Sequence, residues 1–236
     1  MKPPELIVAL DVADERGAWE VTECLAGVVD FYKVGLELFT GVGPRLVREL
    51  RSKGFRVFLD LKLHDIPNTV AGAARAATRA GANLLTLHAL GGTDMMRAAA
   101  EAAAEEAERT GRGAPDLVGV TILTSQRGGL LVGPSDVGSA VGVLASAARE
   151  AGLAGVVASA EECAAIKRSC GRDFLVVTPG IRPSGASAND QRRVATPARA
   201  VAAGSDFLVV GRPILRAQDP RDAASAILDE IRTAVA

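Results

Sequence analysis

Short, continuous apolar runs alternate along the chain with longer alanine-rich stretches. The runs are rich in valine, leucine and isoleucine, which is the composition expected of strands that are buried on both faces. The pattern therefore predicts eight strands, at Leu6–Leu10, Val28–Val34, Phe55–Leu61, Asn83–His88, Leu117–Leu123, Gly155–Ala158, Phe174–Thr178 and Phe207–Val210.

The alanine-rich stretches have helical spacing, and several of them carry start and stop signals. One predicted helix begins at Pro67 and ends at Gly81, and another extends from Thr93 to Arg109. The last predicted helix begins at Asp219-Pro220, where an aspartate cap is followed by proline in the first turn.

Eight strands that alternate with helices indicate a parallel sheet, either closed into a barrel or open and doubly wound. The length of 236 residues favours the barrel, for which about 250 residues is typical. The first predicted strand is followed by Asp11-Val12-Ala13-Asp14, which lacks the glycine fingerprint of dinucleotide-binding sheets. We therefore predict an α/β fold, a (β/α)8 TIM barrel, that forms one catalytic domain over residues 1–236.

The composition limits the partners that the protein can have. The formal net charge of −1 provides no general attraction to nucleic acid or to anionic membranes, so any anion site must be built locally. The three cysteines are odd in number and show no Cys-x-x-Cys spacing, which predicts reduced thiols. The first apolar run is too short for a signal peptide or a membrane span. We therefore expect a cytoplasmic protein with no nucleic-acid or membrane partner.

Ionisable residues end several of the predicted strands. The active sites of eight-stranded barrels lie at the carboxyl ends of the strands, where the sequence places Asp11, Lys33, Asp60 and Lys62. Asp60 and Lys62 are two residues apart, so on a regular strand they point to the same face. Lys33 and Asp11 would complete an alternating array of acids and bases. Such an array is either catalytic or a buried ion-pair network that only satisfies itself.

Glycine and arginine occur together after the last two predicted strands. Gly180-Ile181-Arg182-Pro183 follows the seventh strand, and Gly211-Arg212-Pro213 follows the eighth. Glycine lets the backbone approach an anion closely, and arginine offers a forked donor that matches phosphate oxygens. Because barrels often bind phosphate at these two loops, the pattern favours phosphate binding by Arg182 and Arg212.

Other polar segments are less specific. We interpret Arg192 and Arg193 as a solvated charge pair. The segment 124–137 fits either a lid over the site or an ordinary surface loop. His64 and His88 are the two histidines of the chain, and Lys62 would oppose a cation beside His64, so we expect no metal.

Several motifs in the chain match one known family. The most specific is Asp60–Thr69, which reads Asp-Leu-Lys-Leu-His-Asp-Ile-Pro-Asn-Thr. The others are Ala9–Asp11, Tyr32–Gly35, His88–Gly92, Val120–Ser125, Thr178–Pro183, Asp190–Arg193 and Val210–Pro213. In these motifs the chain resembles the orotidine 5'-phosphate decarboxylases over essentially its whole length, in their short bacterial single-function form. The resemblance implies cofactor-free decarboxylation of orotidine 5'-phosphate to UMP and CO2, a step of de novo pyrimidine biosynthesis.

The resemblance also implies a role for each site residue. Lys62 would protonate C6 of the pyrimidine, and Asp60 would lie beside the departing carboxylate. Lys33 and Asp11 would hold ribose hydroxyls, and Thr124 would contact the base. The phosphate would be held by Arg182, Gln191, Gly211 and Arg212.

The family further implies a homodimer with active sites at the subunit interface. Asp65 would complete the charged array of the partner subunit, and Ile66 and Thr69 would also reach across. The segment that contains Lys62 would then be divided between two active sites.

Two alternatives stay open on the sequence alone. A related barrel that acts on sugar phosphates could share the Asp-x-Lys strand while stabilising an enediolate with magnesium, and a chelator would then abolish its activity. A catalytically silent nucleotide-binding module would release no CO2, although the intact set of Asp60, Lys62 and Asp65 argues against it.

Overall fold

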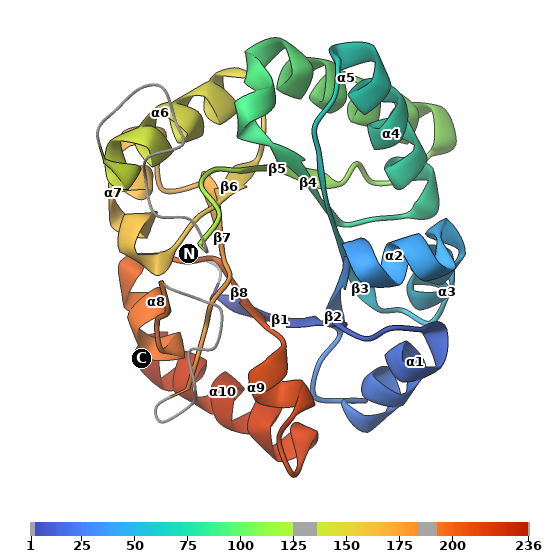
Figure 1. Cartoon of the computed structure of the whole chain (residues 1–236), viewed down its shortest axis with the longest axis vertical. Helices are drawn as coiled ribbons and strands as arrows, with labels where there is room; N and C mark the ends of the chain where they lie inside the picture. Colours follow the sequence, from blue (N-terminus) through green and yellow to red (C-terminus); the bar gives the residue numbers. More distant parts are fainter. Residues whose placement is uncertain (1–2, 125–135, 184–192, 236) are drawn as a thin grey trace.

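The computed structural model describes residues 3–124, 136–183 and 193–235, and these form a closed barrel of parallel strands surrounded by helices (Figure 1). Each strand pairs with the next along the chain, and the last pairs with the first. The strands are β1 (Glu5–Ala9), β2 (Phe31–Gly35), β3 (Arg56–Leu63), β4 (Leu84–His88), β5 (Asp116–Val120), β6 (Gly155–Val157), β7 (Leu175–Thr178) and β8 (Phe207–Val210). The barrel prediction is confirmed, and the open doubly wound sheet is wrong.

The helices form the outer ring of the barrel (Figure 1). They are α1 (Glu15–Cys24), α2 (Leu36–Val42), α3 (Pro44–Ser52), α4 (Pro67–Ala80), the short 3₁₀ helix η1 (Ala89–Gly91), α5 (Gly92–Thr110), α6 (Val137–Glu150), α7 (Ala160–Cys170), α8 (Pro197–Ala203), α9 (Arg212–Leu215) and α10 (Pro220–Val235). Helix α4 begins with proline in its first turn and ends at Gly81, whose φ of 90° is left-handed. The start and stop signals therefore predicted both ends of α4 and α5, and the start of α10, to within one or two residues.

The second strand begins later than predicted. Val28 and Val29 belong to the expected strand at Val28–Val34, but both backbone N–H groups donate to the Leu25 carbonyl and form the turn that ends α1. The apolar side chain of Val29 is buried in that turn. A short apolar run does not by itself distinguish a strand from a buried helix end.

The barrel interior is apolar at the amino-terminal ends of its strands. Alternate residues of the strands point inward, and they form a separate buried cluster of Ile7, Ala9, Phe31, Phe58, Leu84, Val118, Val177 and Val209. Phe31 and Phe207 meet edge to face with their ring centroids 5.8 Å apart. Because the described side chains fill this end, they leave the interior open toward the carboxyl ends of the strands.

Strand β3 is irregular near its carboxyl end. Its pairing with β4 follows Leu59↔Leu85 but resumes at Leu63↔Leu87, which shifts the register between the two strands. Lys62 lies in this interval with a φ of 51°, and no other described non-glycine residue has a positive φ. The chain therefore bulges at the residue that the sequence singles out most strongly.

The described residues also bear on the expected thiols and membrane segments. Cys24, Cys163 and Cys170 are free, as predicted, with Cys24 exposed and the other two buried. Among the described residues, no helix is long and apolar enough to cross a membrane.

Candidate active site

A cavity of about 250 Å³ opens at the carboxyl ends of the strands. Strand alternation explains its charged wall, because Asp11, Lys33 and Asp60 follow the inward-facing Ala9, Phe31 and Phe58 by two residues each. The residues predicted from the sequence that line this cavity are Asp11, Lys33, Asp60, Lys62, Thr124, Arg182, Gly211 and Arg212. The structure therefore brings together eight predicted site residues from six separate segments of the sequence.

Acidic and basic side chains alternate along one side of the cavity. Lys33 Nζ lies 3.1 Å from Asp11 Oδ1 and 3.7 Å from Asp60 Oδ2. Lys62 Nζ lies 2.9 Å from Asp60 Oδ1. The Asp60 side chain is 14% exposed and Lys62 is 31% exposed, so Asp60 is largely enclosed and Lys62 still reaches the open cavity. The predicted alternating array is present within this single chain from Asp11 to Lys62.

The backbone conformation that places the Lys62 side chain beside Asp60 differs from the predicted regular strand. Regular alternation was expected to place both side chains on one face, but Lys62 is left-handed and lies in the bulge. Its backbone N–H donates to Thr86 Oγ1 at 2.8 Å, and the Thr86 hydroxyl lies 3.1 Å from Asp60 Oδ1. A left-handed conformation in a non-glycine residue costs on the order of 1–3 kcal/mol and persists only where its surroundings enforce it.

Thr86 contacts the charged array but was not predicted from the sequence. It lies in the middle of the apolar strand β4, where it is fully buried. Its inward direction follows from Leu84, which belongs to the interior cluster. A polar residue at an inward position of a strand, two residues before His88, was the signal that could have identified it.

The residues after β7 and β8 that line the cavity are the predicted phosphate ligands. Arg182 is 7% exposed, and its backbone N–H donates to the Ala195 carbonyl at 2.9 Å. A Cβ on Gly211 would lie 3.0 Å from Asp11 Oδ2, so any side chain there would press on the charged array. Arg212 follows at once and also lines the cavity. Gln191 and most of the segment 124–137 lie outside the described residues.

Three predicted site residues do not line this cavity. Asp65, Ile66 and Thr69 are all exposed, and Ile66 is 66% exposed despite its apolar side chain. Asp65 Oδ1 accepts a hydrogen bond from the Ile66 backbone at 2.6 Å. The structure therefore places these three residues at the surface, outside the cavity.

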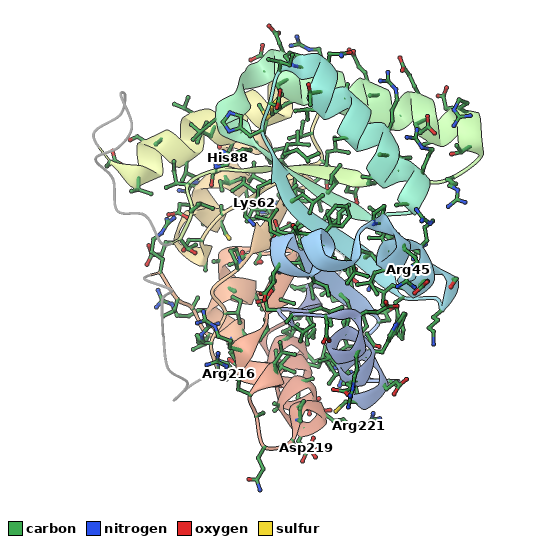
Figure 2. The ribbon with its side chains drawn as sticks, turned by 45° about the vertical axis from the view of Figure 1, so that its right-hand side comes forward. Arg45, Lys62, His88, Arg216, Asp219 and Arg221 are labelled. Carbon is green, nitrogen blue, oxygen red and sulfur yellow. The ribbon has the colours of Figure 1, made fainter. Side chains whose placement is uncertain are left out.

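The two histidines lie beside the charged array. Their ring centroids are 5.5 Å apart, and Figure 2 labels His88 together with Lys62, from the neighbouring strands β4 and β3. Burial lowers the pKa of His88, and the nearby His64 and Lys62 lower it further. Within the described part of the chain, no group of three or more histidine, cysteine or acidic side chains is arranged to hold a metal ion.

Arg193 is not the solvated charge that the sequence suggested. Its side chain is 13% exposed, it pairs with Glu162 of α7, and it donates to the Ile122 carbonyl at 3.1 Å. Ile122 lines the cavity, and the strand-like bridge Ile181↔Ala195 lies beside Arg193. Arg193 therefore connects the loop after β7 with the end of β5. Arg192 lies outside the described residues.

Replacing Arg193 by methionine is expected to lower the free energy of unfolding by about 3 kcal/mol, because Glu162 would be left buried without its cation. Burial already raises the pKa of Glu162, and Arg193 opposes that effect. An acid whose pKa is raised by folding binds its proton more tightly in the folded state, so protonation favours folding at low pH. The loss of unfolding free energy in Arg193→Met, measured by denaturant unfolding, should therefore be smaller at about pH 5 than at about pH 8.

The matched control for that variant is Arg168→Met, since Arg168 is an exposed arginine on the same helix as Glu162. Its effect should stay within about 0.5 kcal/mol at both pH values. Equal losses in the two variants, or a deficit in Arg193→Met that grows at low pH, would contradict the buried ion pair.

Comparison with known proteins gives concordant results. The family model described as "Orotidine 5'-phosphate decarboxylase / HUMPS family" matches residues 4–227. The orotidine 5'-phosphate decarboxylase of Maridesulfovibrio salexigens is 53% identical over 231 residues, which is 97% of this chain and 99% of that protein. That of Moorella thermoacetica is 51% identical over 231 residues, covering 96% of this chain and 92% of its own.

Solved structures agree with the sequence relatives. The crystal structure of orotidine 5'-phosphate decarboxylase from Lactobacillus acidophilus superposes with a TM-score of 0.86 at 38% identity, covering 98% of this chain and 99% of that one. The enzyme from Pyrococcus horikoshii OT3 gives a TM-score of 0.75 at 28% identity, covering 97% and 99%.

Proposed function

Because this chain belongs to the orotidine 5'-phosphate decarboxylase family, it is a decarboxylase of pyrimidine biosynthesis, and we propose that its charged array carries out the chemistry. The substrate is orotidine 5'-phosphate, and the products are UMP and CO2. The observation that carries the proposal is the sequence of contacts Asp11–Lys33–Asp60–Lys62 in a cavity that also contains Arg182 and Arg212.

The reaction needs an unusually well prepared site. Loss of CO2 from C6 leaves the bonding electron pair on the ring carbon, in the ring plane, where no neighbouring carbonyl can delocalise it. Enzymes lower barriers by about 8–23 kcal/mol, and this reaction needs the upper part of that range. One group alone cannot lower the barrier by so much. The charged array, the phosphate ligands and the enclosed cavity each contribute to lowering it.

Lys62 acts as the electrostatic partner and the proton donor for C6. Its ammonium group reaches the open cavity while Asp60 holds it at 2.9 Å. As the C6–carboxylate bond breaks, the ammonium stabilises the developing negative charge. The Nζ proton then bonds to C6 to give UMP, and the lysine recovers its proton from solvent. Asp60, next to the departing carboxylate, favours the loss of that negative group.

The other cavity residues bind and orient the nucleotide. Asp11 and Lys33 hold the ribose hydroxyls, and Thr124 contacts the base. Arg182, Gly211 and Arg212 hold the phosphate, together with Gln191. Binding energy from this remote group can order the reacting end without acting on it directly.

We also propose that the protein is a cytoplasmic homodimer with shared active sites. The residues from His64 to Thr69 are all exposed, although they continue directly from the strand that carries Lys62. Ile66 and Leu90, which follow β3 and β4, expose 66% and 45% of their surface. A second copy of the chain would cover them and bring Asp65 to the array of its partner.

Arg212→Ala tests the phosphate part of the proposal. We expect kcat/KM for orotidine 5'-phosphate to fall about 10- to 100-fold, because a charge-assisted hydrogen bond to the phosphate is lost. Turnover of the phosphate-free nucleoside orotidine should not change. Steady-state assays with both substrates, each with and without EDTA, measure these effects.

The control is Arg216→Ala, because Arg216 is exposed four residues along and does not line the cavity. It should retain wild-type kinetics. If the wild-type enzyme uses orotidine as well as the nucleotide, the phosphate role is wrong. Loss of activity with EDTA would instead favour magnesium-dependent chemistry.

A further inference from the structure

We propose that Thr86 is a positioning residue for the decarboxylation, and that its hydroxyl fixes Asp60 and Lys62 relative to each other. The inference rests on the proposed roles of those two residues. Thr86 does not line the cavity and is fully buried in β4. It would therefore act only through the residues that it holds.

The contacts of Thr86 form a closed ring with the reacting pair. The Lys62 backbone N–H donates to Thr86 Oγ1 at 2.8 Å, and Thr86 Oγ1 donates to Asp60 Oδ1 at 3.1 Å. The ring closes where Lys62 Nζ donates to the same Oδ1 atom at 2.9 Å. A hydroxyl offers one donor, which is directed here at Asp60, and it accepts from Lys62 at the same time.

The bulge in β3 explains why such a group is needed. The register of β3 against β4 shifts between Leu59 and Leu63, so the usual ladder does not serve the Lys62 N–H. Thr86 supplies an acceptor for this N–H from the neighbouring strand, and that bond supports the left-handed backbone at Lys62. The hydrogen bond from the Lys62 N–H to Thr86 Oγ1 therefore stabilises the bulge and also orients the Lys62 side chain.

The Thr86 hydroxyl also determines how the two carboxylate oxygens of Asp60 are oriented toward two lysines. Asp60 Oδ1 faces Lys62 and Thr86, while Oδ2 lies 3.7 Å from Lys33 Nζ. Without the Thr86 donor, the carboxylate could rotate toward Lys33 and draw away from Lys62. A displacement of this kind would alter the distance between the ammonium and C6 without removing any group that binds the nucleotide.

Thr86→Val is the sharpest test, because valine keeps the branched shape and replaces the hydroxyl with a methyl group. We expect kcat to fall about 100-fold, the size expected when a reacting group is misplaced by about 1 Å. KM for orotidine 5'-phosphate and the dissociation constant for UMP should stay at wild-type values. Thr86→Ser restores a hydroxyl and should recover most of the lost kcat.

A general loss of stability is excluded with Thr78→Val as the matched control. Thr78 is also fully buried, and its hydroxyl donates to the Ala74 carbonyl at 2.9 Å within α4, away from the cavity. It should lose thermal stability and keep wild-type kcat. Should Thr86→Val fail to fold, Thr86→Ala removes the same hydroxyl, and the same criteria apply to it.

The outcomes separate this inference from the proposed function. If Thr86→Val keeps wild-type kcat while Lys62→Ala is inactive, the positioning role is wrong and the proposed function stands. A fall in kcat that Thr86→Ser does not reverse also overturns it, since the hydroxyl would not be the cause. Full activity in Lys62→Ala would overturn the proposed function itself.

Discussion

Lys62→Ala is expected to abolish decarboxylation while leaving UMP binding measurable. On the proposed mechanism, the variant removes both the proton donor and the cation that faces the developing charge at C6. Loss of a general acid costs about 10²–10⁴-fold, and loss of a preorganised electrostatic partner costs about 10²–10³-fold. We therefore expect kcat to fall by at least about 10⁴-fold.

The array should otherwise survive this change. Asp60 would still lie 3.7 Å from Lys33 and 3.1 Å from the Thr86 hydroxyl. The proposed phosphate ligands Arg182, Gly211 and Arg212 follow other strands and would be unaffected, so UMP should still bind. Release of CO2 from labelled substrate and calorimetry with UMP measure the two properties separately.

Lys53→Ala is the control, since Lys53 is an exposed lysine whose ammonium lies over the Trp19 ring on the outer surface. It should keep full activity. Substantial CO2 release by Lys62→Ala, in protein free of wild-type enzyme, would rule out the proposed mechanism.

Mixing two inactive variants, Lys62→Ala and Asp65→Ala, is expected to restore activity through hybrid dimers. In a hybrid, one site would combine both changes and the other would contain neither. Random exchange in equal amounts makes about half of the dimers hybrid, so roughly one quarter of all sites should be intact. The recovered rate should approach that fraction of the wild-type rate.

The chain offers a matched control for this experiment. Asp60 and Lys62 contact each other within one subunit, so both residues of a site come from the same chain. Mixing Asp60→Ala with Lys62→Ala should therefore restore nothing. No recovery in the first mixture despite demonstrated subunit exchange, or equal recovery in both mixtures, would show that the sites are not shared.

The strand ends were predictable because one physical rule governs them. Buried parallel strands are apolar, so a charged residue at the end of such a strand stands out, as Asp11, Lys33 and Asp60 do. The caps of α4 and α10 were equally readable, because proline and glycine have restricted or special backbone preferences. These local signals were sufficient to predict the barrel and one wall of its cavity.

The remaining features depend on contacts between distant segments. The bulge at Lys62 is supported by Thr86 from the next strand, so the sequence around Lys62 does not predict the bulge. The sequence alone predicts that Arg193 belongs to a charged surface pair, because Glu162 and the Ile122 carbonyl come beside it only in the folded chain. The structure of a short apolar run such as Val28–Val29 depends on the preceding helix, because its N–H groups donate to the Leu25 carbonyl at the end of that helix.

The left-handed backbone of Lys62 has a consequence for how this sequence can change. Glycine is the residue that such a conformation favours, but glycine has no ammonium group. At this position, selection for a stable fold and selection for turnover therefore favour different residues. With the proposed role, Lys62 is a site where the protein gives up stability for activity, and variants selected for thermal stability alone should tend to lose the lysine.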